Sequence, residues 1–316
     1  MAATVDTPAS LRGERWRLRL RSARSFLRQF SRKRAGVAGI VVLAIFAVLA
    51  IAPGFFVGPL ETVTTATGKH IEPPSVHEFL GTDSLGRSVL NLTIWGTRVS
   101  MAIGLLATIV TIVVGAVVGI VSGFFGGWID GILMRITDLF LVLPTFVLAL
   151  ILAPIILEIV GSDAEIFGIR ITLIVIVVVI GLTSWASTAR VVRSQVLSLK
   201  ERAFVDRARV IGSGGAHIMR RHLLPNVINL IIANTVLTFA GAVLTETTLS
   251  FIGLGDPFQP SWGQILNDAE TAGATTLGAW WWVVAPSACI VLVVLAFTLV
   301  GNALDEILNP RLQGRR

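Results

Sequence analysis

One acidic residue inside an apolar segment is the first candidate for chemistry in this chain. Glu246 lies near one end of the segment Val227–Leu249, which is rich in aliphatic residues. A carboxylate at membrane depth is costly, and such groups often belong to a pore or a gate. A gating or pore role is therefore one interpretation of Glu246. An interfacial position, or hydrogen bonds between packed helices, would explain the same residue.

Side chains suited to catalysis or metal binding are few. A P-loop needs the pattern G-x4-G-K-[ST], so that backbone amides and a lysine cradle phosphate groups. The chain has three lysines, and the one Gly-Lys pair, Gly68-Lys69, is followed by His70. Its four histidines lack the spacing of metal ligands, and its single cysteine, Cys289, cannot form an intrachain disulfide. We expect no catalytic site, no metal site and no cofactor on this chain.

The elements that carry these residues are apolar. Hydrophobic residues make up 54% of the 316 and charged residues 14%, and the mean hydropathy is +0.81. Soluble domains carry about 25% charged residues. A helix needs about 20 apolar residues to cross about 30 Å of hydrocarbon. Six segments qualify, and we expect each to be a helix because lipid satisfies no backbone group: Ala35–Val57, Val99–Val121, Ile132–Leu157, Ile171–Ala189, Val227–Leu249 and Val283–Leu304.

The basic residues indicate the orientation of these six segments. With the N-terminus inside, 22 of the 26 Lys and Arg residues fall in the cytoplasmic parts. Such asymmetry is typical of multi-pass proteins and predicts that both termini are cytoplasmic. The net charge of +7 therefore reflects topology, and no nucleic-acid partner is expected.

The expected organisation is all-α. Before the first span, Trp16, Leu20, Ala23, Leu27 and Phe30 recur at helical spacing among arginines, which predicts an amphipathic helix on anionic lipid. A transit peptide is the competing interpretation of that composition. The predicted parts are a cytoplasmic N-terminal segment (1–34), a first span (35–57), an extracytoplasmic segment (58–98), a five-helix core (99–304) with a cytoplasmic loop (190–225), and a cytoplasmic tail (305–316).

The long cytoplasmic loop has the pattern of two short helices. Phe204, Ala208 and Ile211 share one helical face, and the glycines that follow at 212, 214 and 215 end the first helix. A second short helix is expected over Ala216–Leu224, ended by Pro225. Apolar faces that two short helices cannot bury between themselves suit a groove on a partner protein. A solvated surface loop is the alternative.

This loop resembles the cytoplasmic signature of permeases from ATP-binding-cassette (ABC) importers, E-A-A-x3-G-x9-I-x-L-P. The chain has Asp206-Arg207-Ala208, then Gly212 after three residues and His222-Leu223-Leu224-Pro225 after nine. Ala208, Gly212, Leu224 and Pro225 match the signature, Asp206 is a conservative substitution, and Arg207 and His222 depart from it.

More of the chain resembles the C-type permease subunit of dipeptide and oligopeptide importers, which has six transmembrane helices in the type I importer fold. The matching pieces run in order from residue 80, as 80–87, 123–127, 138–144, 246–255, 304–305 and 309–311. The resemblance implies a second permease subunit (B-type), two ABC ATPase domains and an extracytoplasmic binding protein, and a place in the bacterial cytoplasmic (inner) membrane. ATP and Mg²⁺ are expected on the partner subunits, and nickel importers share this subunit type.

The resemblance and the local patterns together nominate three sets of residues. A loop contact with the binding protein is one interpretation of Asp83 and Arg87, and a loop-ordering ion pair is the other. Arg135 and Asp138 lie one helical turn apart and predict a local ion pair. Coupling to the ATPases is expected from Glu201, Phe204, Asp206, Arg207, Ala208, Gly212, Leu224 and Pro225.

Two other classes of protein are alternatives to this one. An ion-gradient-driven secondary transporter usually carries ionisable residues near the membrane midplane. The first, second and sixth predicted spans have no Asp, Glu, Lys or Arg inside them, which argues against that class. An intramembrane hydrolase needs a nucleophile and a base at membrane depth, and no histidine lies there.

Overall fold

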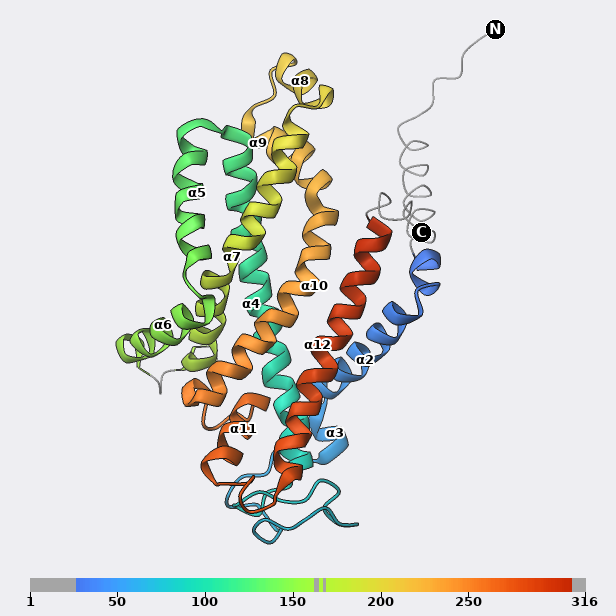
Figure 1. The fold of residues 1–316 in the computed structure, drawn as a ribbon, viewed down its shortest axis with the longest axis vertical. Coiled ribbons are helices and arrows are strands. Elements are labelled where there is room, and N and C mark those ends of the chain that lie inside the picture. Colours follow the sequence, from blue (N-terminus) through green and yellow to red (C-terminus); the bar gives the residue numbers. More distant parts are fainter. Residues whose placement is uncertain (1–26, 162–164, 167–168, 309–316) are drawn as a thin grey trace.

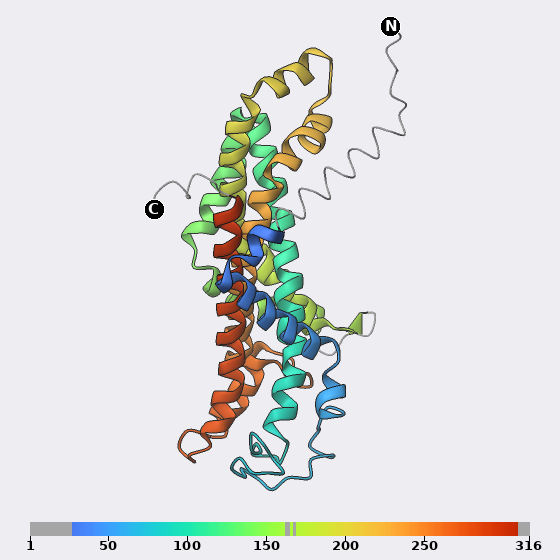
Figure 2. The ribbon, with the colours of Figure 1, turned by 90° about the vertical axis from the view of Figure 1, so that its right-hand side faces the viewer.

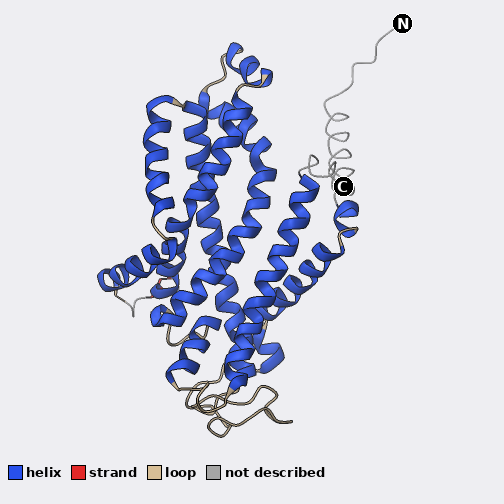
Figure 3. Cartoon of the chain, in the orientation of Figure 1, coloured by secondary structure: helices blue, strands red, loops and turns tan. Residues whose placement is uncertain are grey.

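The fold is described by a computed structural model that covers residues 27–161, 165–166 and 169–308. Almost all regular structure in these ranges is helical (Figure 3). The exceptions are two short antiparallel strands, β1 (Glu165–Ile166) and β2 (Ile169–Arg170). The all-α prediction is confirmed. The amphipathic stripe predicted before the first span lies mostly outside the described residues, as does the end of the tail.

The α-helices are α2 (Arg34–Ile51), α3 (Pro53–Val57), α4 (Val89–Phe125), α5 (Gly127–Val142), α6 (Thr145–Val160), α7 (Ile171–Lys200), α8 (Ala203–Val210), α9 (Gly215–Ile218), α10 (Leu224–Leu249), α11 (Trp262–Thr271) and α12 (Trp280–Leu308). Two π-helical turns, η1 (Met219–Leu223) and η2 (Ser250–Leu254), flank α10.

Several of these helices are long and apolar enough to cross a membrane. Five described helices qualify, namely α2, α4, α7, α12 and the continuous segment Gly215–Leu254 that contains α10. The pair α5–α6 makes a sixth span if it is counted as one, although the two helices meet at 93°. The chain is therefore a multi-pass membrane protein, whose described residues hold five candidate spans, or the six that the sequence predicts if α5–α6 is counted as one.

The third predicted span is wrong as a single continuous helix. The chain breaks between α5 and α6, at Leu143 and Pro144, and Figure 1 shows α6 leaving the bundle sideways. Leu143 has extended backbone angles, φ −77° and ψ 129°. Proline disfavours helical angles in the residue before it, because its Cδ clashes with that residue's backbone. The first predicted span breaks in the same way, before Pro53.

The central helices extend beyond the predicted apolar segments. α4 has 37 residues and α7 has 30. At 1.5 Å per residue α4 is about 56 Å long, which exceeds a hydrocarbon core of about 30 Å. Hydropathy marks only the lipid-embedded part of such helices. The loop before α4 lies at one end of the molecule and α8 at the other (Figures 1 and 2).

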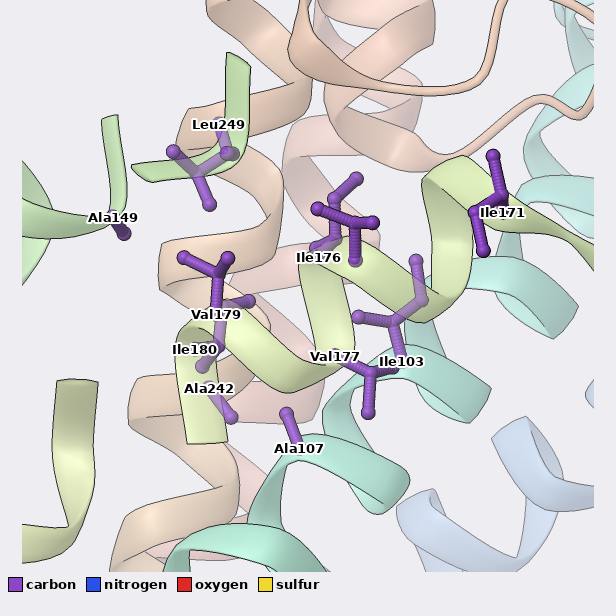
Figure 4. Packing of buried hydrophobic residues seen from close by; sticks show 12 residues of the cluster. Ile103, Ala107, Ala149, Ile171, Ile176, Val177, Val179, Ile180, Ala242 and Leu249 are labelled. Atoms are coloured by element: carbon purple, nitrogen blue, oxygen red, sulfur yellow. The ribbon is translucent and has the colours of Figure 1, made fainter. Parts of the chain in front are cut away.

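The most extensive interface between described helices joins α4 to α7. Gly115, Gly119 and Gly123 recur every four residues along one face of α4. A Cβ atom on Gly119 would lie 2.6 Å from the carbonyl oxygen of Ala189, closer than packed atoms approach. Glycine therefore allows the two backbones to meet, as small residues do in membrane helix pairs. Toward the opposite end, aliphatic residues of α4, α6, α7 and α10 form the cluster shown in Figure 4.

Candidate functional site

A helical knob, residues 201–225, projects at one end of the bundle. Helix α8 forms its first arm, and α9 with η1 forms the second, which leads into α10. Both views place α8 beyond the ends of the other described helices (Figures 1 and 2). The two predicted helices are therefore present, and α8 extends beyond the end of the bundle.

The glycine turn between the arms has the geometry of a helix stop. Gly212 has φ +84°, in the left-handed region that glycine adopts without a steric penalty. Its N–H donates to the carbonyl oxygen of Arg209 at 2.9 Å, and the Ser213 N–H donates to that of Ala208 at 3.0 Å. These two bonds satisfy the last carbonyls of α8 and reverse the chain.

The predicted end of the second arm at Pro225 is wrong. Helical structure runs without a break from Gly215 through η1 and α10 as far as the kink at Gly253, where φ is +94°. Pro225 is the second residue of α10 and follows the π-helical turn η1. The second arm is thus continuous with a candidate span.

One face of the knob is buried against the bundle. Val205 and Ala208 of α8 pack in a cluster with Ile218, Leu223 and the α7 residue Val196. This contact fixes α8 in place. Phe204 is partly buried beside the same cluster. The predicted common face of Phe204, Ala208 and Ile211 is therefore incomplete, because Ile211 points away from it.

The outer face ends in an apolar tip, Val210 and Ile211. Their exposed fractions are 88% and 82%. Sequence reasoning missed Val210, although a β-branched apolar residue on the charged face of a short helix was a usable signal. The remaining predicted coupling residues are distributed as follows: Glu201, Asp206, Arg207, Gly212, Leu224 and Pro225 are exposed, and Ala208 is buried. Asp206 pairs with Arg209 at 3.5 Å, one turn away.

Two ion pairs tie α5 to α7 near the base of the knob. Arg193 donates two hydrogen bonds of 2.6 Å to the carboxylate of Asp130. Arg190 donates to Asp138 at 2.5 Å. The predicted local pair of Arg135 with Asp138 is therefore wrong, because the carboxylate bonds across the helix interface. A forked arginine-carboxylate pair fixes geometry as well as charge.

Glu246 is completely buried in a polar cluster near the other end of the bundle. Ser250 Oγ donates to Glu246 Oε1 at 2.9 Å, and the hydroxyls of Ser100, Thr247 and Ser261 surround the same carboxyl group. Oε2 has no hydrogen-bond partner among the described residues. In this structure Glu246 therefore lies between packed helices, as the packing alternative expects, and lines no open surface.

The loop before α4 is ordered by Asp83. Its carboxylate is buried and accepts hydrogen bonds from the backbone N–H groups of Leu85 and Arg87, both at 2.8 Å. Arg87 Nε donates to the same carboxylate at 2.6 Å. This is the geometry of the loop-ordering interpretation. A contact of this loop with a binding protein would have to use Arg87 or neighbouring residues, since Asp83 has no exposed surface.

Metal-binding groups do not gather in the described part of the chain, where no three His, Cys, Asp or Glu side chains could hold one ion. His217 and His222 face each other across the second arm, with ring centroids 5.9 Å apart. The arrangement as a whole is that of a multi-pass helical membrane protein with a rigid knob on one side.

Comparison with known proteins identifies the class more closely. A family model described as the binding-protein-dependent transport system inner membrane component matches residues 115–314. The chain belongs to this family, so it is a transport component of the membrane that works with a binding protein. The predicted family is confirmed.

Named relatives match almost the whole chain. The dipeptide transport system permease protein DppC of Bacillus subtilis (strain 168) is 33% identical over 90% of this chain and 85% of the relative. A putative peptide permease protein of Brucella suis biovar 1 (strain 1330) is 36% identical over 92% of this chain and 90% of its own. A putative peptide transport system permease protein of Brucella abortus biovar 1 (strain 9-941) is 31% identical over 90% of this chain and 91% of the relative.

Proposed function

We propose that this chain forms half of the pore of a peptide importer and that separate ATPase subunits drive it. The names of the relatives support a dipeptide or oligopeptide as substrate. The expected assembly contains a B-type permease, two ABC ATPase domains and an extracytoplasmic binding protein. ATP and Mg²⁺ would bind the ATPases, because this chain lacks the P-loop pattern.

The knob is the observation that carries the coupling proposal. Its apolar tip is exposed in the described part of the chain, while its inner face is packed and its second arm is continuous with α10. A tip that inserts into a groove on an ATPase would pass the motion of that subunit to a membrane span through one rigid helix. The proposed orientation, with the knob and both termini in the cytoplasm, puts the tip on the side where ATP is available.

The exposed face of α10 supports a pore on the same span. Asn234, Thr238, Gly241, Thr245 and Thr248 follow one another at intervals of three or four residues and are exposed or partly exposed. Lipid would favour apolar side chains on such a face. Threonine hydroxyls that donate to carbonyls one turn back, as at Thr245 and Thr248, can still accept hydrogen bonds from a solute.

A pull-down experiment tests the coupling proposal. The chain is purified in mild detergent from cells that carry the whole transport operon, and the associated ATPase is quantified. Val210→Asp places a charge on the tip and should remove most of the ATPase, whereas Val76→Asp should retain it. Val76 is the matched control because it is 86% exposed, almost as much as Val210 at 88%, but lies at the opposite end. Equal ATPase recovery from both variants would refute the role of the tip.

Uptake into vesicles tests the substrate and the energy source. Right-side-out vesicles with the binding protein should accumulate a labelled dipeptide or oligopeptide when ATP is inside, and an ionophore should leave this uptake intact. Accumulation of nickel in place of peptides would transfer the assignment to the nickel alternative. Uptake that the ionophore abolishes while ATP remains would favour the ion-gradient alternative.

A further inference from the structure

A cavity at the edge of the bundle is not explained by transport or coupling. It has a volume of about 370 Å³ and lies where α2 begins and α12 ends. Figures 1 and 2 show these two helix ends side by side, well away from α8. The charged side chains that line it are Arg32, Lys33, Arg34 and Glu306. Three cations and one anion leave a net charge of +2 in this cavity.

The charges inside the cavity are only partly compensated. Lys33 pairs with Glu306 across the gap between the helices. Arg32 and Arg34 are exposed, and neither makes an ion pair within the described part of the chain. The first turn of α2 also has no acidic residue and no side-chain cap. The cavity is therefore suited to an anion with oxygen acceptors.

An apolar track leads from the cavity along α12. Leu292, Leu295, Leu299, Asn302 and Glu306 succeed one another at intervals of three and four residues, so they share one face. Leu299 and Asn302 line the cavity with Glu306, and the two leucines beyond them are 46% and 50% exposed. The face thus changes from charged to polar to aliphatic, which is the order of groups in a phospholipid from its phosphate to its acyl chains.

We propose that this cavity binds the phosphate of an anionic phospholipid whose acyl chain lies along the leucine track. The apolar part of α2 begins directly after Arg34, so the cavity sits at the level where the headgroups of that leaflet meet the hydrocarbon. Basic pockets between membrane helices at this depth are suited to anionic headgroups. The site also bridges α2 and α12, so an occupant would hold the first span against the last. This inference does not rest on the identity of the transported solute or of the ATPases.

Native mass spectrometry of the full-length chain in non-ionic detergent tests the proposal. The chain is titrated with phosphatidylglycerol and, separately, with phosphatidylcholine of the same acyl composition. Phosphatidylglycerol should bind more tightly. The double variant Arg32→Gln/Arg34→Gln should weaken its binding about thirtyfold, since each basic residue near an anionic surface contributes about fivefold. Glu306→Gln should tighten it, because the change removes the one carboxylate among the described residues that line the cavity and ends its ion pair with Lys33.

A double variant that removes the same two positive charges outside the cavity tests whether binding is specific to this site. Arg135→Gln/Arg202→Gln removes two exposed arginines outside the cavity and should leave phosphatidylglycerol binding within twofold of the parent. Equal weakening by both double variants would show nonspecific attraction and overturn the proposal. The melting temperature of each variant is measured in detergent without lipid. An unchanged melting temperature shows that a loss of lipid binding does not result from unfolding.

Two further binding measurements distinguish a lipid from a soluble phosphate. Glycerol 3-phosphate, which carries the headgroup chemistry without acyl chains, should not displace phosphatidylglycerol at tenfold excess. Dihexanoyl phosphatidylglycerol should bind more weakly than the dioleoyl form, because its short chains cover less of the leucine track. Displacement by glycerol 3-phosphate, or equal affinity of the two lipids, would refute the acyl track and leave a simple anion site.

Discussion

Substitution of Gly212 separates backbone strain from crowding in the glycine turn of the knob. The residue has φ +84°, and a Cβ added there would meet no atom within 4 Å. Within this chain, the penalty must therefore come from the backbone angle, and the control at Gly214 tests for contact with a partner. An L-residue in the left-handed region costs about 1–2 kcal/mol, asparagine costs less, and β-branched residues are rarely found there. These energies correspond to about 5- to 30-fold changes in the population of the turn.

We expect ATP-dependent uptake to be highest with glycine at position 212 and to fall in the order Asn, Ala and Val. We expect about a fivefold loss for Gly212→Ala and about a thirtyfold loss for Gly212→Val. The assay is peptide uptake into vesicles that carry the whole transporter, normalised to the amount of this chain in the membrane. Membrane insertion should be unchanged, because the turn lies outside every apolar segment.

Gly214 provides the matched control for this series. It lies in the same turn and also has open space around it, but its φ is −65°, which any residue adopts. Gly214→Ala should retain uptake within twofold. Full uptake by Gly212→Val would refute the role of the turn geometry. Equal damage from Gly214→Ala would show that the loop tolerates no side chain, whatever its backbone angle.

Two further predictions concern the bundle. Gly119→Leu should destabilise the α4–α7 interface by about 1–3 kcal/mol and lower the melting temperature in detergent, because the new Cβ would lie 2.6 Å from a carbonyl oxygen of α7. The control Gly131→Leu should leave the melting temperature unchanged, because a Cβ at Gly131 meets open space. Equal melting temperatures of the two variants would contradict the packing argument. In a Cys289→Ala background, Thr245→Cys should react with a membrane-impermeant thiol reagent, because we expect α10 to line a hydrated pore. Val113→Cys, on the apolar face of α4, should stay unlabelled. The reverse labelling pattern would place α10 against lipid.

Much of the architecture followed from local signals. Runs of about 20 apolar residues predict spans because an unbonded backbone cannot enter lipid, and this requirement depends on no neighbouring helix. The helix stop at Gly212 is local for the same reason, since a left-handed angle is a property of one residue. The break at Pro144 was also local. Hydropathy does not register it, because Leu143 and Pro144 lie within an apolar run.

Partners and exposure were decided by tertiary structure. Asp138 has an arginine one turn away in sequence, yet it bonds to Arg190 because α5 packs beside α7. Helical periodicity places Ile211 with Ala208, but the turn carries Ile211 outward and leaves it exposed with Val210. The cavity at Arg32 and Glu306 joins residues more than 270 positions apart. Short sequence windows carry no information on such contacts, because they depend on which faces of distant helices bury each other.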